Sequence, residues 1–305
     1  MHINSKLYRV LIGLVIGLFS VKSHAVLNVF ACEPEWKALI EILGKERVDV
    51  VSATNAFQDP HYIEARPSLI VKLRRADFLI CTGADLEIGW LPLLLKKSGN
   101  QKVLATQPGH FMASDFVKRL EIPHRHDRSD GDVHAAGNPH VHLDPQRLLL
   151  VATELKNRLI QVEPEHERFY ENNYRAFKTR WLSNMDRWKQ QAEPLLGKEF
   201  IVYHRNWSYL FDWLSLKELA DLEPKPGVPP NSRYLTALLS KTDSTQAKGI
   251  LVSNYQNPKA AHWLSERTAL PVITLPFTVG ANDDVQTLEG LFDAIIDQLL
   301  INGEK

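Results

Sequence analysis

The chain has 305 residues, of which 36 are Lys or Arg, 36 are Asp or Glu and 12 are His. This balanced charge gives no basic excess of the kind that nucleic-acid binding needs, so we expect no nucleic-acid partner. The length suits two domains of ordinary size.

Residues 1–25 have the pattern of a secretory signal. Lys6 and Arg9 precede an apolar run over 10–19, and the small residues Ser23 and Ala25 stand where cleavage requires them. The apolar run is shorter than the ~20 residues that span a bilayer. We therefore expect a cleaved signal peptide and a free periplasmic protein, with a retained N-terminal anchor as the alternative.

Strand-like and helical segments alternate along the rest of the chain. Apolar runs predict strands at 26–31, 48–52, 78–81, 102–105, 200–203, 249–253 and 271–275. Helical spacing and Pro and Gly near the ends predict helices at 33–43, 66–76, 86–97, 232–242, 258–268 and 285–301. Such alternation is typical of βα units around a parallel sheet.

A segment of different character, 164–193, separates the two α/β halves. Its apolar residues recur at helical spacing, so it predicts one helix roughly 45 Å long. The expected fold class is α/β, with two Rossmann-like lobes around central parallel sheets joined by one long rigid helix. The expected divisions are a signal peptide (1–25), an N-terminal lobe (26–160), a linking helix (161–195) and a C-terminal lobe (196–305).

Two cysteines, Cys32 and Cys81, each end an apolar run. In an oxidising compartment they have the opportunity to pair. A disulfide between neighbouring strands is restricted by its geometry, and cysteine often serves as a small buried apolar residue. We favour two free thiols, and the disulfide stays open.

Three separated histidines are candidate metal ligands. His61 and His140 each follow a proline, and His204 directly follows an apolar strand-like run. Ligands of open α/β sheets gather at the carboxyl ends of strands, and three neutral imidazoles suit zinc. A single histidine at such a place more often serves the structure, and the spacing of these three matches no local metal motif, so the prediction depends on their combination.

Longer motifs surround these histidines and occur along nearly the whole mature chain. They are Asp59-Pro60-His61, Arg66-Pro67-Ser68, Leu73-Arg74-Arg75-Ala76-Asp77, Thr82-Gly83-Ala84-Asp85-Leu86-Glu87, Asn138-Pro139-His140, Leu143-Asp144-Pro145, Val202-Tyr203-His204 and the stretch 222–230. In these motifs the chain resembles the substrate-binding proteins of ABC transporters for zinc and manganese, the zinc-importer type in particular.

The resemblance implies that the metal lies in the cleft between the lobes, with His61, His140 and His204 as its ligands. It implies capture of Zn²⁺ as transported cargo and delivery to an inner-membrane ABC permease, with no reaction catalysed. We expect a monomer, and a periplasmic metallochaperone is a second candidate partner.

The fourth ligand is open. The family commonly supplies an aspartate just after the last strand of the second lobe, where this chain has Pro276. Asp283 or Asp284 from the following loop, or water, are the alternatives. Three imidazoles without a carboxylate favour zinc over manganese, which prefers oxygen ligands.

A polar loop before His140 contains His124, His126 and His134. Such tracts bind metal loosely, and family members often carry a loop of this kind that is thought to gather zinc. A merely solvated loop is the equal alternative. We expect His142 to pack in the interior or to contact a metal-ligating side chain without binding the metal itself. We expect Asp144 to cap the helix that starts at Pro145.

Two other functions remain as alternatives. One is a manganese- or iron-binding member of the same transporter class. The other is a three-histidine zinc hydrolase, since such a site also activates water. The hydrolase is disfavoured because no Asp or Glu in the three histidine motifs is an evident general base.

Overall fold

The computed structural model describes residues 26–123, 134–242 and 247–303. The expected signal peptide at 1–25 and the loop residues His124 and His126 lie outside these ranges. Within them, no helix has both the length and the apolar character needed to cross a membrane.

The first lobe is built on a parallel sheet with strand order β2-β1-β3-β4. The strands are β1 (Leu27–Ala31), β2 (Val48–Ser52), β3 (Phe78–Cys81) and β4 (His110–Met112). The flanking helices are α2 (Pro34–Gly44), α3 (Pro67–Arg75) and α4 (Leu91–Ser98), each with proline in its first two positions. Proline fixes the helical φ there and loses no hydrogen bond. All side chains of β3 are buried, as expected for a central parallel strand.

The second lobe repeats this plan with strand order β6-β5-β7-β8, again all parallel. The strands are β5 (Glu199–Val202), β6 (Lys217–Asp221), β7 (Ile250–Ser253) and β8 (Val272–Leu275). The helices are α7 (Ser208–Leu214), α8 (Ser232–Thr242), α9 (Lys259–Thr268) and α10 (Leu288–Gly303). The predicted α/β class with two parallel sheets is confirmed.

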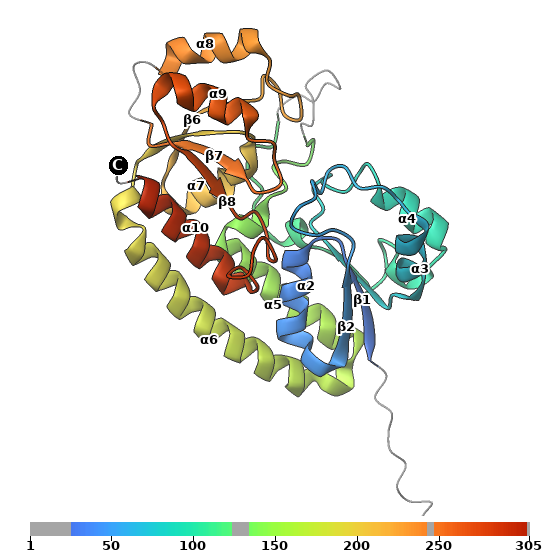
Figure 1. Ribbon diagram of the computed structural model, residues 1–305. Coiled ribbons are helices and arrows are strands. Elements are labelled where there is room, and N and C mark those ends of the chain that lie inside the picture. The colour runs from blue at the N-terminus through green and yellow to red at the C-terminus, as the bar shows by residue number, and fades with distance from the viewer. Residues whose placement is uncertain (1–25, 124–133, 243–246, 304–305) are drawn as a thin grey trace, which may run out of the picture.

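Two helices connect the lobes, α5 (Pro145–Val162) and the 25-residue α6 (Glu167–Gln191). Figure 1 shows α6 running along both lobes, past α2 of the first and α10 of the second. Its buried stripe includes Trp181 and Trp188, which both contact Phe292 of α10. One apolar core, which contains side chains of both sheets, is continuous through this seam.

Some element predictions were wrong. The expected strand at 102–105 is replaced by a 3-10 turn over Gln101–Val103, and the edge strand β4 comes later. The helix expected from residue 86 begins only at Leu91, because Ala84 and Asp85 form a turn with φ of 49° and 65°. Strand β6 and helix α7 were not predicted.

The expectation of two free thiols was also wrong, since Cys32 and Cys81 form a disulfide. Cys32 directly follows β1, Cys81 ends the adjacent parallel strand β3, and their Cα atoms are 4.8 Å apart. Both side chains point into the same apolar cluster, so the strand spacing itself brings the sulfurs together within the range that disulfides accept.

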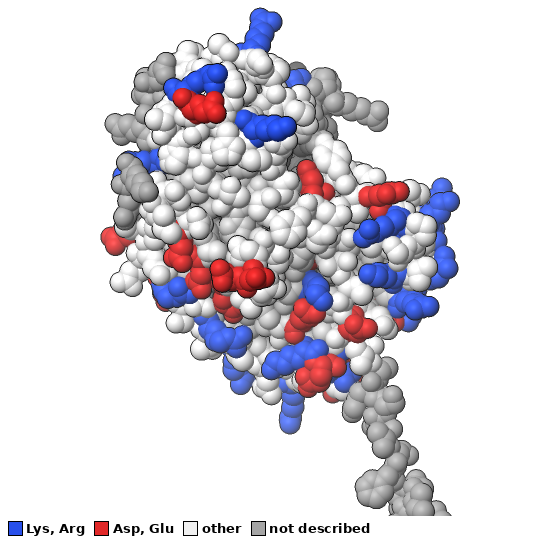
Figure 2. Space-filling view, in the orientation of Figure 1, with Lys and Arg blue, Asp and Glu red and all other residues white. Residues whose placement is uncertain are grey.

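Charged side chains of both signs are scattered over the surface in Figure 2, with Lys and Arg gathered over α3 and α4. These helices carry Lys72, Arg74, Arg75, Lys96 and Lys97 in their last turns and no acidic residue. In a βα unit the helix ends at the edge of the sheet opposite to the carboxyl ends of the strands. The basic surface is therefore remote from the histidines.

Candidate metal centre

His61 lies on the loop between β2 and α3. Asp59, separated from it by Pro60, turns back so that its Oδ1 accepts the His61 Nδ1–H at 2.7 Å and the His61 backbone N–H at 3.0 Å. Trp90 Nε1 donates to the carbonyl of Pro60 at 2.9 Å and anchors the loop. With Nδ1 engaged, Nε2 of His61 faces the cleft as the free donor.

His140 lies on the turn that leads into α5 and is 1% exposed. Asn138 Oδ1 accepts its backbone N–H at 3.0 Å, while Asn138 Nδ2 donates to the backbone carbonyl of Arg205 in the second lobe at 2.8 Å. The turn is thereby tied to the segment that follows His204. Nδ1 of His140 is buried and has no hydrogen-bond partner among the described residues.

His204 lies two residues after the end of β5 and directly precedes a 3-10 turn. Its Nδ1 donates to Glu223 Oε2 at 2.6 Å, and the same oxygen accepts the backbone N–H of Gly227 at 2.8 Å. Pro224 follows Glu223 and favours an extended backbone at that residue. Glu223 thus does for His204 what Asp59 does for His61.

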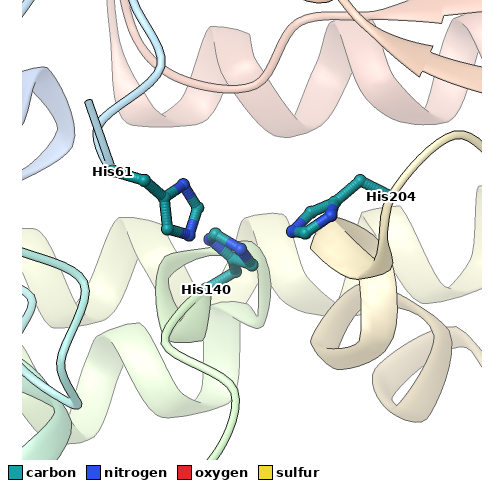
Figure 3. A group of neighbouring side chains, drawn as sticks. All are labelled: His61, His140 and His204. Carbon is teal, nitrogen blue, oxygen red and sulfur yellow. The ribbon is translucent and has the colours of Figure 1, made fainter. Parts of the chain in front are cut away.

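The three imidazoles converge. One ring nitrogen from each of His61, His140 and His204 lies within 4.8 Å of the others, and the ring centroids are 5.6 to 6.0 Å apart. Figure 3 shows His61 and His204 facing each other from the two lobes, with His140 between them. Three nitrogens at this spacing suit the surroundings of one metal ion.

Burial and neighbouring charges favour the protonation states that a metal site needs. Burial lowers the pKa of His140 well below its usual value, and the adjacent His61 and His204 lower it further, so this ring stays neutral. Burial alone would raise the pKa of Asp59, but its contacts with His61 outweigh burial and bring the pKa below the usual range. The site therefore combines a neutral His140 ring with an ionised Asp59 carboxylate behind the His61 ring.

Comparison with known proteins agrees with this geometry. The family model described as zinc-uptake complex component A, periplasmic, matches residues 29–300. This chain belongs to that family.

Individual relatives of this metal-binding family are distant in sequence. The chain is 23% identical over 268 residues to the manganese ABC transporter substrate-binding lipoprotein PsaA of Streptococcus pneumoniae, covering 86% of this chain and 83% of that one. It is 24% identical over 205 residues to the high-affinity zinc uptake system protein ZnuA of Yersinia pestis, covering 63% and 64%. A crystal structure of ZnuA superposes with a TM-score of 0.77 at 19% identity, covering 91% of this chain and 99% of that chain.

The other residues that the sequence suggested as metal ligands lie outside the three-histidine cluster. Asp283 and Asp284 are exposed, and Asp284 lines a separate hollow with Pro276. Of the loop histidines in the described residues, His134 lines the same cavity as His140 and His204. No carboxylate of the described chain belongs to the cluster.

His142 and Asp144 serve the structure, as expected. His142 lies between the lobes, with Nδ1 3.3 Å from Glu35 Oε1 and Nε2 3.0 Å from the carbonyl oxygen of Phe277. Asp144 caps α5 by accepting the backbone N–H groups of Gln146 and Arg147.

Sequence reasoning did not assign roles to the carboxylates that hold two of the rings. Asp59 was within the motif of His61, and its place two residues before the histidine was a usable signal. Glu223 is 19 residues from His204, and only the pairing of β5 with β6 brings it close. No local pattern in the sequence indicates that contact.

Proposed function

We propose that this protein captures Zn²⁺ in the periplasm with His61, His140 and His204 and delivers it to an inner-membrane ABC permease. It acts as a monomer and catalyses no reaction. The observation that carries the proposal is the convergence of the three rings from two lobes, with Nδ1 of His61 and His204 each bonded to a carboxylate. These contacts fix the tautomer that directs Nε2 to a metal and increase its basicity.

Zinc is preferred over manganese on the chemistry of the donors. Relatives named for manganese and for zinc both match the chain, so relatedness leaves the metal open. The donors that cluster in this site, His61, His140 and His204, are all imidazole nitrogens. Nitrogen donors suit zinc, whereas manganese prefers carboxylate, carbonyl and water oxygens.

Capture rather than hydrolysis is favoured by the occupation of the nearest carboxylates. Asp59 and Glu223 each accept the Nδ1–H of one imidazole. A general base for hydrolysis must instead reach a water molecule on the metal.

The test is metal competition on the chelator-stripped protein, in which zinc, manganese and iron are compared by calorimetry. His61→Ala, His140→Ala and His204→Ala are measured beside the parent. His262→Ala is the matched control, because His262 is exposed on α9 in the second lobe.

One tight zinc site that is lost in the three cleft variants and kept in the control is the expected result. Zinc binding that survives all three substitutions refutes the ligand set. A clear preference for manganese refutes the assignment of zinc as cargo.

A further inference from the structure

A fourth imidazole lies against the three-histidine cluster. His134 Nε2 is 3.1 Å from His61 Nε2, and the two rings stack with centroids 5.2 Å apart. His134 also lines the cavity of about 210 Å³ that His140 and His204 line. His134 is the first residue of the polar loop that the structure describes after the gap at 124–133.

The contact joins the two nitrogens that a metal would use. Nδ1 of His61 is held by Asp59, so His61 presents Nε2 to the cleft, and Nε2 of His134 meets that atom directly. In a zinc tetrahedron with Zn–N bonds of about 2.0–2.1 Å, neighbouring nitrogens are roughly 3.4 Å apart. The separation of 3.1 Å is already close to that value. Nothing in general packing requires two imidazole Nε2 atoms to face each other.

The first lobe holds the His134 segment in place. The backbone of Asp85 hydrogen-bonds the His134 side chain, and Asp85 Oδ2 accepts the backbone N–H of Ala136 at 3.4 Å. Gly137 has φ +98°, and a Cβ there would lie 2.8 Å from the carbonyl oxygen of Leu120. The segment therefore packs too closely at Gly137 for a larger residue. A bond from the backbone to the ring is also the support that ligand imidazoles commonly have.

The residues expected to supply an oxygen ligand lie away from the three-histidine cluster. Asp283 and Asp284 are exposed. Pro276 follows β8, and the ring of the next residue, Phe277, lies edge-on to His140 with ring centroids 5.4 Å apart. An apolar ring there excludes a carboxylate from that side of the site.

We propose that His134 is the fourth ligand, which completes an all-imidazole site and makes the protein selective for zinc over manganese. The inference rests on the proposed function and deepens it. Four neutral nitrogens disfavour manganese. The charge of the ion is balanced from behind the rings by Asp59 and Glu223, which accept the Nδ1–H groups of His61 and His204.

The test compares His134→Ala with the parent, with His61→Ala as the positive control and His262→Ala as the matched surface control. Zinc and manganese affinities are measured by chelator competition. Cobalt is then substituted for zinc, and its visible spectrum is recorded with and without added azide, which binds only an open coordination position.

In His134→Ala, zinc affinity should fall by roughly 10- to 100-fold or more, since even an outer partner of a ligand is worth that much. Manganese affinity should be unchanged. Azide should alter the cobalt spectrum of His134→Ala and leave those of the parent and His262→Ala unaltered.

Two results overturn the inference and differ in what they mean. If zinc affinity is lost in His61→Ala but both affinity and cobalt spectrum are unchanged in His134→Ala, the three-histidine function stands and His134 is no ligand. If the parent binds no zinc tightly, the proposed function fails together with this inference.

Discussion

Replacement of Glu223 by glutamine isolates the effect of one buried negative charge on metal affinity. Glu223 is 8% exposed, and its Oε2 alone accepts both the His204 Nδ1–H and the Gly227 backbone N–H. The amide oxygen of glutamine accepts both of these hydrogen bonds. Glu223→Gln therefore keeps the position of the ring and removes the charge that increases the basicity of its Nε2.

The expected loss follows from the role of Glu223 as a direct partner of a ligand. Removal of such a partner typically costs 10- to 100-fold in metal affinity, or about 1.4 to 2.7 kcal/mol. Chelator competition at neutral pH measures the change. Glu266→Gln is the control, because the Glu266 side chain is 74% exposed on α9 and remote in sequence from each histidine motif.

A zinc affinity of Glu223→Gln equal to that of the parent would refute this reasoning. Glu223→Ala separates the two parts of the effect, since it also leaves Gly227 without its acceptor. If only the alanine variant binds zinc more weakly than the parent, Glu223 acts by holding the conformation of its loop and not by its charge.

Three further outcomes concern stability. Burial raises the pKa of Glu87 from its ordinary value to about 7, so the folded state binds this proton more tightly than the unfolded state. The contribution of Glu87 to the free energy of unfolding should therefore be fully present below about pH 4 and fall by up to about 3 kcal/mol as pH rises through 7. Urea denaturation of metal-free Glu87→Gln should show a flatter pH profile, and an unchanged profile would contradict the assignment. The double variant Cys32→Ala, Cys81→Ala should lose about 4 kcal/mol of unfolding free energy, because the disulfide closes a loop with a sequence separation of 49. Urea denaturation measures this loss. Thr278→Val removes a 2.5 Å hydrogen bond to buried Glu35 and should lower the free energy of unfolding by about 2 kcal/mol. Thr278→Ser keeps a hydroxyl and should lower it less, and thermal melts of both variants measure the difference.

The sequence predicts the central strands and the edge strands β2 and β8 well, and the edge strands β4 and β6 poorly. β3 and β7 are buried along their whole length, so they stand out as continuous apolar runs. β6 is an edge strand of sequence Lys-Glu-Leu-Ala-Asp, and its charged residues leave no apolar run by which it could be predicted. β4 is another edge strand and has only three residues. An edge strand that is short or rich in charged residues leaves no apolar run in the sequence, so β4 and β6 were missed.

In the site, too, local sequence marks some residues, whereas other contacts depend on the tertiary fold. The three histidines were identified because strand ends and X-Pro turns mark their places in the sequence. The contacts of His204 with Glu223 and of His61 with His134 span 19 and 73 residues. They depend on how β5 and β6 pair and on how the loop before His140 returns to the cleft. Such contacts follow from the tertiary fold, and no local spacing encodes them.

The continuous apolar core through α6 makes the two lobes one cooperative unit. Trp181 and Trp188 contact α10 of the second lobe, while the same helix packs on α2 of the first. Neither lobe keeps its core if the other melts, so calorimetry should show one transition with equal calorimetric and van't Hoff enthalpies. A ligand that binds only the folded state at a thousand times its Kd adds about 4 kcal/mol to that single transition. A metal ion bound between the lobes, as proposed, would therefore stabilise both lobes together.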